Sequence, residues 1–158
     1  AMGRKLVVIG GGEMLDEIRR LAGPSVTVLG PQHFSVLRHH YARCRALIFP
    51  GEEDFGMVPV EAMASGRPVV AYGRGGATET VVDGVTGVFF SEQTADAIAD
   101  AEARLSSRRF EPARIVEHAR QFSTERFERE FRDYVDRLME QGRARPGMRQ
   151  RPAPPPLS

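Results

Sequence analysis

The chain has 158 residues, a formal net charge of +1 and a single cysteine, Cys44. This length suits one domain with a hydrophobic core. Acidic and basic residues are interleaved, so we expect no surface for nucleic acid. One cysteine excludes a disulfide framework and a thiolate metal site. No apolar run approaches the roughly 20 residues of a membrane-spanning helix, and no signal-peptide pattern is visible, so we expect a cytoplasmic protein.

Short apolar runs alternate with helical patterns over the first 90 residues. The runs are rich in β-branched residues, as in buried parallel strands, and cover 5–10, 25–30, 46–51, 67–73 and 86–90. This alternation predicts an α/β fold with one sheet of about five parallel strands and helices on both faces. Ligand sites in such sheets lie beyond the carboxyl ends of the strands. Four of the five predicted strands end there in glycine or proline, namely Gly10, Gly30, Pro50 and Gly73.

The pattern becomes helical after the last predicted strand. Helices are predicted over 92–107, 112–122 and 123–142. Ser123 or Thr124 can serve as the N-cap of the last one. Its apolar stripe consists of Phe127, Phe131, Tyr134, Val135 and Leu138. Residues 143–158 are rich in arginine and proline, which predicts disorder. We therefore expect a domain over 1–142 and a tail over 143–158.

The stretch EEDFGMVPVEAMASG, residues 52–66, places acidic residues around the start of a predicted helix. Pro59 suits the first helical position, where a missing N–H costs nothing. The backbone amides from about Phe55 to Val58 then lie at the positive end of the helix, which favours phosphate or another anion. Gly56 lets the backbone approach a ligand closely.

Two glutamates flank this predicted anion site. Glu61 is expected near the third helical position, where an acid can simply favour the helix dipole by about 0.3–1 kcal/mol. Alternatively, its carboxylate can accept hydrogen bonds from the vicinal hydroxyls of a ribose beside the phosphate. Glu53, just outside the helix, can accept from the hydroxyls of a second sugar. The combination of the anion site with two carboxylates favours the second interpretation.

Residues 49–90, FPGEEDFGMVPVEAMASGRPVVAYGRGGATETVVDGVTGVFF, resemble the signature region of the retaining GT-B-fold glycosyltransferases of the fourth family. The E-x7-E motif of that family is matched by Glu53 and Glu61, and EAMASGRPVVA follows. The resemblance extends from about Arg4 to Phe131. The segments PGEEDFG, VPVEA and GGATETV are most similar to bacterial and archaeal mannosyltransferases of O-antigen and exopolysaccharide assembly.

The resemblance implies a Rossmann-like domain, one half of a GT-B fold, that binds a nucleoside diphosphate sugar. GDP-mannose is the donor that the mannosyltransferase subgroup implies. Glu61 is assigned to the ribose hydroxyls, and Glu53 is assigned to the transferred sugar as the catalytic residue. The backbone of four residues is implied to hold sugar and diphosphate, namely Phe55, Gly56, Met57 and Val58. The base is implied to pack on Leu29, Gly30 and Pro31, and the cleft is implied to be lined by Gly11, Gly12, Gly75 and Gly76.

The resemblance further implies that neither a metal nor a cofactor is needed. Family members open this domain with another strand, followed by an arginine and a lysine that clamp the diphosphate, and they have an N-terminal acceptor-binding domain. Here only Ala1, Met2 and Gly3 precede RKLVVIGGG, with no room for that strand. We therefore expect the donor-binding part of an enzyme that transfers a hexose to a glycan or lipid-linked acceptor, peripheral at the inner face of the membrane. The chain alone is expected to be inactive.

The same motifs allow other interpretations. The run Gly10-Gly11-Gly12 resembles a dinucleotide fingerprint, but Leu15 stands where the third glycine belongs, which favours a tight turn lining the cleft. Glu52 and Asp54 resemble a metal-binding acid pair without further candidate ligands. Paired carboxylates also serve glycosidases, but those need an acid held protonated in an apolar pocket, which nothing here indicates.

Two further motifs have simple structural interpretations. The histidines show no ligand spacing, although His33 lies in the presumed base loop. The segment GGATE, residues 75–79, can be a plain turn and N-cap or a loop lining the cleft. The rival to a glycosyltransferase is a non-catalytic nucleotide-binding or interaction module.

Overall fold

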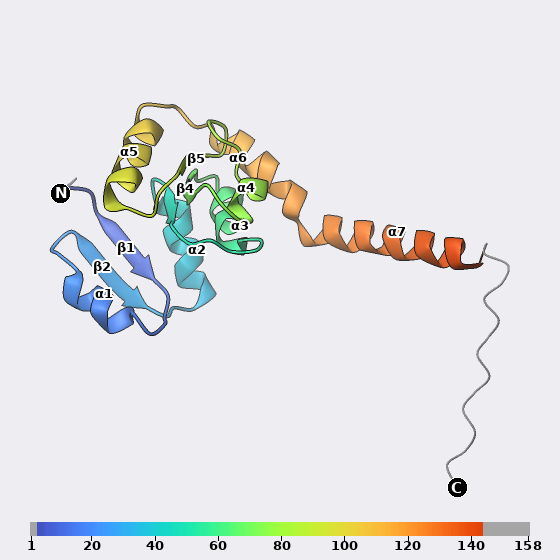
Figure 1. The fold of residues 1–158 in the computed structure, drawn as a ribbon, viewed down its shortest axis with the longest axis horizontal. Coiled ribbons are helices and arrows are strands. Elements are labelled where there is room, and N and C mark those ends of the chain that lie inside the picture. The colour runs from blue at the N-terminus through green and yellow to red at the C-terminus, as the bar shows by residue number, and fades with distance from the viewer. Residues whose placement is uncertain (1–2, 144–158) are drawn as a thin grey trace, which may run out of the picture. The chain divides into compact units, whose positions relative to one another are not determined.

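The computed structural model describes residues 3–143, and its internal contacts divide the chain after Gln121. Each part is described by itself (Figure 1). The first part contains the five predicted strands, β1 (Leu6–Ile9), β2 (Val26–Gly30), β3 (Leu47–Phe49), β4 (Val69–Tyr72) and β5 (Gly87–Phe90). Its helices are α1 (Leu15–Leu21), α2 (Phe34–Arg43), α3 (Met57–Ala64), α4 (Ala77–Thr80), α5 (Ala95–Ser106) and α6 (Pro112–Ala119). A 3₁₀ turn, Arg120–Phe122, follows α6.

Every paired strand runs parallel to its neighbour, which confirms the Rossmann-like α/β prediction. The strands form two hydrogen-bonded sheets rather than one, with the orders β1-β2 and β3-β4-β5. No ladder joins β1 to β3 among the described residues. Leu6 and Val7 of β1 remain about 40% exposed, whereas all four residues of β4 are buried. Parallel strands are normally covered on both sides, so β1 has the character of an edge strand.

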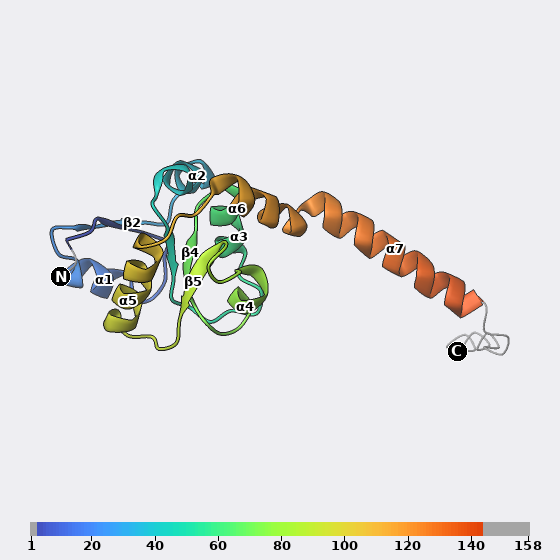
Figure 2. The ribbon, with the colours of Figure 1, turned by 90° about the horizontal axis from the view of Figure 1, so that it is seen from above.

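The core of the first part lies on both faces of the three-stranded sheet. α5 covers one face, where Ala101 and Leu105 pack against Val70, Val88 and Phe90. α3 packs on the other face and against α6, and Met63 and Ile115 of these helices are fully buried. Figure 2 shows α5 and α3 on opposite sides of β4 and β5. Because successive side chains of a strand point to opposite faces, both faces of β4 are apolar.

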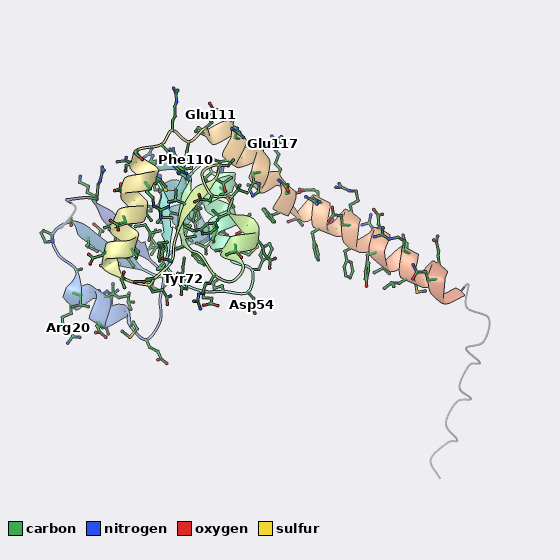
Figure 3. All side chains as sticks on the ribbon, turned by 45° about the horizontal axis from the view of Figure 1, so that its top comes forward. Arg20, Asp54, Tyr72, Phe110, Glu111 and Glu117 are labelled. Carbon is green, nitrogen blue, oxygen red and sulfur yellow. The ribbon has the colours of Figure 1, made fainter. Side chains whose placement is uncertain are left out.

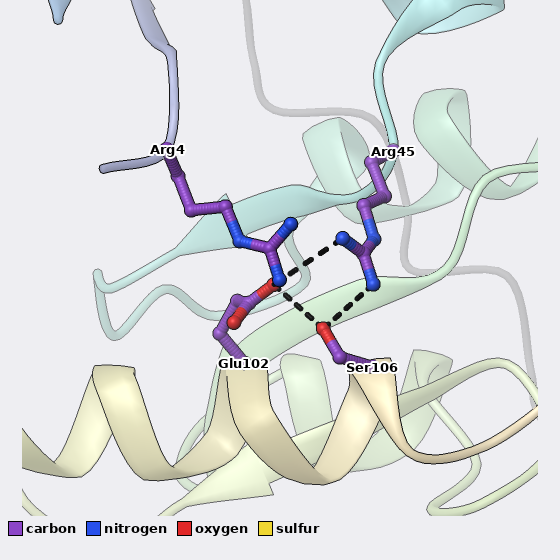
Figure 4. A network of polar contacts seen from close by, with 4 residues as sticks. All are labelled: Arg4, Arg45, Glu102 and Ser106. Carbon is purple, nitrogen blue, oxygen red and sulfur yellow. Dashed lines mark hydrogen bonds and ion pairs between the residues drawn. The ribbon is translucent and has the colours of Figure 1, made fainter. Parts of the chain in front are cut away.

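A polar network on α5 holds the segments that precede β1 and β3 (Figure 4). The Glu102 Oε1 atom lies 3.4 Å from Arg4 Nη2 and 3.9 Å from Arg45 Nη1. Ser106 Oγ donates a hydrogen bond of 2.7 Å to the same oxygen and accepts one of 2.7 Å from Arg45 Nη2. The amino ends of both sheets are therefore attached to one helix.

The second part consists of the chain from Phe122 onward and contains α7 (Thr124–Arg143). Ser123 is its N-cap, because its Oγ accepts from the Arg126 amide at 3.3 Å. The predicted apolar stripe is exposed on this helix, and Phe127 and Phe131 stack with ring centroids 5.8 Å apart. The predicted tail begins at Arg143, the last residue of α7, and otherwise lies outside the described residues. No helix within residues 3–143 combines the length and apolar character needed to cross a membrane.

Candidate functional site

A pocket of about 370 Å³ lies at the carboxyl end of the three-stranded sheet. Its volume falls in the range of small-molecule sites. It is formed by the acidic loop after β3 and the turn after β4, and its lining residues are Glu52, Glu53, Asp54, Gly75, Gly76, Thr78 and Glu79. Figure 3 shows Asp54 and Tyr72 at this end of the sheet. The expected location of a site in a parallel sheet is thus occupied by a polar, strongly acidic pocket.

Two glycines let the acidic loop after β3 pack directly against the turn after β4. The Gly76 amide donates a 2.7 Å hydrogen bond to the Glu53 carbonyl oxygen. A Cβ atom at Gly76 would lie 2.4 Å from Phe55 Cα, and one at Gly75 would lie 2.5 Å from the Glu53 carbonyl oxygen. Gly75 also has a φ of +61°, which disfavours any other residue. Two of the predicted segments therefore meet here, and GGATE is both the turn that opens α4 and part of the pocket lining.

The start of α3 differs from the prediction. The helix begins at Met57 after Gly56, whose φ is +78°, so Pro59 is the third helical residue rather than the first. Proline is tolerated at this position because the first four N–H groups of a helix have no acceptor within the helix. The amides of Met57 and Val58 belong to this first turn. The positive end of the helix dipole therefore lies next to the acidic loop.

Glu61 is the fifth residue of α3 rather than the third, because the helix begins two residues earlier than predicted. Its side chain is half-buried. The Tyr41 hydroxyl on α2 donates a 3.0 Å hydrogen bond to Glu61 Oε2. Burial raises the pKa of Tyr41 well above its usual range, and the Glu61 charge and this hydrogen bond raise it further. The phenol is therefore a neutral, permanent donor to the carboxylate.

The glycine-rich turn and the presumed base loop meet at the end of the two-stranded sheet. A Cβ atom at Gly11 would lie 2.9 Å from Pro31 Cγ, so glycine is needed for this close approach. The amide of Gly10 donates to the carbonyl oxygen of Gly30 at 3.0 Å. Gln32 Nε2 donates to the Leu29 carbonyl oxygen at 2.9 Å and closes the loop. Gly12, with a φ of +142°, precedes α1.

The histidine in the presumed base loop has a structural role. His33 is the N-cap of α2, and its Nδ1 accepts a 3.3 Å hydrogen bond from the Ser35 amide. It also borders a second hollow of about 460 Å³ on α2, together with Phe34, Ser35, Arg38, His39 and Ala42. Within the described part of the chain, no three or more His, Cys, Asp or Glu side chains are grouped as metal ligands would be.

Sequence reasoning missed the part that Tyr41 plays at the site. Tyr41 is on the apolar face of α2 and is 9% exposed, so its sequence pattern is that of a core residue. No motif relates position 41 to position 61. Thr78 and Glu79 line the pocket within the GGATE segment, for which the sequence allowed a loop lining the cleft.

Comparisons with known proteins identify the family and the fold of the chain. Residues 2–108 match the family model described as glycosyl transferases group 1. A GDP-mannose-dependent alpha-(1-6)-phosphatidylinositol monomannoside mannosyltransferase of Mycobacterium tuberculosis is 35% identical over 116 residues, which are 65% of this chain and 30% of that protein. A D-inositol 3-phosphate glycosyltransferase of Geodermatophilus obscurus is 40% identical over 100 residues, which are 62% of this chain and 22% of that protein.

The fold is also that of a solved glycosyltransferase. The apo form of the lipopolysaccharide outer core galactosyltransferase WaaB superposes with a TM-score of 0.73 over 85% of this chain and 41% of that one, at 19% identity. The chain thus spans less than half the length of each of these proteins. Because the family model covers more than half of the chain, this protein belongs to the glycosyl transferases group 1 family.

Proposed function

We propose that the chain is the donor-binding part of a retaining glycosyltransferase that moves a hexose from a nucleoside diphosphate sugar to a glycan or lipid-linked acceptor. One observation carries this proposal: the acidic loop with Glu53 packs on Gly75 and Gly76 beside the start of α3, which also bears Glu61. Membership of a glycosyltransferase family supports the reaction class. Since the chain spans 30% of the mycobacterial relative and 22% of the Geodermatophilus relative, the activity is that of the whole enzyme.

The first turn of α3 is proposed to bind the diphosphate. The amides of Met57 and Val58 and the helix dipole favour an anion there, and the backbone at Phe55 and Gly56 would contact the sugar. These groups supply positive potential without a metal ion. Glu61 would accept hydrogen bonds from the ribose hydroxyls, and Glu53, the catalytic residue, would accept from those of the transferred sugar.

The donor is proposed to be GDP-mannose, with its base on the loop Leu29–Pro31. That loop packs on the turn at Gly11, so a base resting there would have a rigid support. The name of the mycobacterial relative states a dependence on GDP-mannose. The segments PGEEDFG and VPVEA support the same donor and a role in O-antigen or exopolysaccharide assembly. An N-terminal domain of the same enzyme would bind the acceptor.

The two glutamates provide a test of these roles. Glu61→Ala should weaken GDP binding by about 1–3 kcal/mol, the usual loss for a hydrogen bond to a charged group. Glu53→Ala should leave GDP binding unchanged and impair only sugar transfer by the full-length enzyme. Glu17→Ala on α1 serves as the matched control for loss of an exposed carboxylate. Equal loss of GDP affinity in the Glu53 and Glu61 variants would contradict the division of roles.

The donor is tested by ranking ligands for the same chain. Calorimetric titration or ligand-observed NMR should place GDP above UDP and ADP. If UDP binds best, the mannosyltransferase assignment is wrong while the glycosyltransferase proposal stands. If no nucleoside diphosphate or its sugar binds at millimolar concentration, the rival proposal of a non-catalytic interaction module is favoured.

A further inference from the structure

The hydrogen bond between Tyr41 and Glu61 joins two helices, and its donor lies outside every motif that the sequence analysis identified. The donor is on α2 and the acceptor is on α3, and these helices pack against each other. The Tyr41 ring is buried at 9% exposure, so the packing around it fixes the direction of its hydroxyl. Glu61, in contrast, is half-buried and has a long, flexible side chain.

The chemistry of the pair allows the carboxylate to bind a ligand while the phenol holds it. An ionised carboxylate has two oxygens with about four acceptor sites in all. Tyr41 donates to one site on Oε2, which leaves the others for incoming hydroxyls. Burial keeps the pKa of Tyr41 high, so the phenol stays protonated and adds no negative charge to the site. A pre-oriented acceptor gains affinity because less side-chain freedom is lost on binding.

We infer that Tyr41 is a positioning residue that holds the Glu61 carboxylate in the orientation required by vicinal ligand hydroxyls, and that it thereby sets a preference for ribonucleotides over 2′-deoxyribonucleotides. This inference rests on the ribose role proposed for Glu61. The simpler alternative is that Tyr41 is a buried core residue whose hydroxyl forms a hydrogen bond, as most buried tyrosines do, without any functional role. That alternative predicts effects on stability but none on ligand choice.

The experiment titrates GDP and 2′-deoxy-GDP into the full chain by calorimetry. Tyr41→Phe keeps the ring and removes only the donor. Tyr134→Phe on α7 removes a phenol oxygen from the other part of the chain and is the matched control. Glu61→Ala, which removes the acceptor, and the double variant complete a cycle between donor and acceptor. The ratio of the two affinities does not depend on the folded fraction, so partial unfolding of a variant leaves the result interpretable.

The unmodified chain is expected to prefer GDP. Tyr41→Phe should lower the affinity for GDP by about fivefold, the effect of one hydrogen bond, and that for 2′-deoxy-GDP by less than about twofold. The Tyr134→Phe variant should match the unmodified chain. In the Glu61→Ala background, where the acceptor of this hydrogen bond is absent, loss of the Tyr41 hydroxyl should have no further effect on the ratio.

The contrary results have different meanings. If the unmodified chain prefers GDP and Tyr41→Phe keeps that preference in full, Tyr41 has no positioning role, while the proposed role of Glu61 stands. If Tyr41→Phe weakens both ligands equally, the residue is purely structural. If the unmodified chain binds neither ligand, or binds both equally, the proposed ribose contact fails and the inference fails with it.

Discussion

Replacing Gly76 with alanine tests whether the acidic loop depends on the glycine turn. Gly76 has φ −59° and ψ −20°, a right-handed helical conformation that alanine adopts without strain. Any loss of stability must therefore come from the contact of the added methyl group. That methyl carbon would lie 2.4 Å from Phe55 Cα and 2.5 Å from the Asp54 carbonyl oxygen. Both are backbone atoms, so no side-chain rotation can relieve the overlap.

The size of the effect follows from two opposing terms. Overpacking costs about 1–3 kcal/mol, and a contact with backbone belongs at the upper end of this range. The alanine also reduces the conformational freedom of the unfolded chain, which stabilises the folded state by roughly 0.4–1 kcal/mol. We expect Gly76→Ala to lower the free energy of unfolding by about 2 kcal/mol. Urea denaturation followed by circular dichroism measures this difference.

Gly51→Ala is the matched control in the same loop. A Cβ atom there would meet no heavy atom within 4 Å, and φ is not positive. This variant should be as stable as the unmodified chain or more stable by up to about 1 kcal/mol. Equal stability of the Gly76→Ala and Gly51→Ala variants would refute the packing of the loop on the turn.

The remaining predictions concern pH and metal ions. Burial, the Glu61 charge and the hydrogen bond raise the pKa of Tyr41, so above about pH 10 the unfolded chain releases a phenolic proton that the folded chain retains. Relative to Tyr41→Phe, the unmodified chain should therefore lose about 1.4 kcal/mol of stability per pH unit above that value. Denaturation experiments would contradict this if the free energies of unfolding of the two proteins changed equally with pH. In the full-length enzyme, EDTA should leave the rate of sugar transfer unchanged, because the α3 dipole and backbone amides stabilise the negative charge of the diphosphate. A strict requirement for a divalent metal ion would instead implicate Glu52 and Asp54.

The order of strands and helices could be read from the sequence because local patterns are sufficient for it. The β-branched runs gave the positions of the five strands, and the helical patterns gave those of α5, α6 and α7. The acidic stretch and the E-x7-E spacing likewise identified the loop and helix of the candidate site. The start of α3 was missed by two residues because proline fits any position in a first turn, so Pro59 marks the turn and not the first residue.

Contacts between distant positions were decided only by the tertiary structure. A glycine at position 76 has no local reason to be glycine, since its backbone is helical; the reason is the backbone of residues 54 and 55, which packs against it. Tyr41 has the pattern of a core residue, and only the packing of α2 on α3 brings its hydroxyl to Glu61. The five strands divide into two sheets according to which strand edges share hydrogen bonds. The sequence does not predict this division, because all five apolar runs predict a strand equally well.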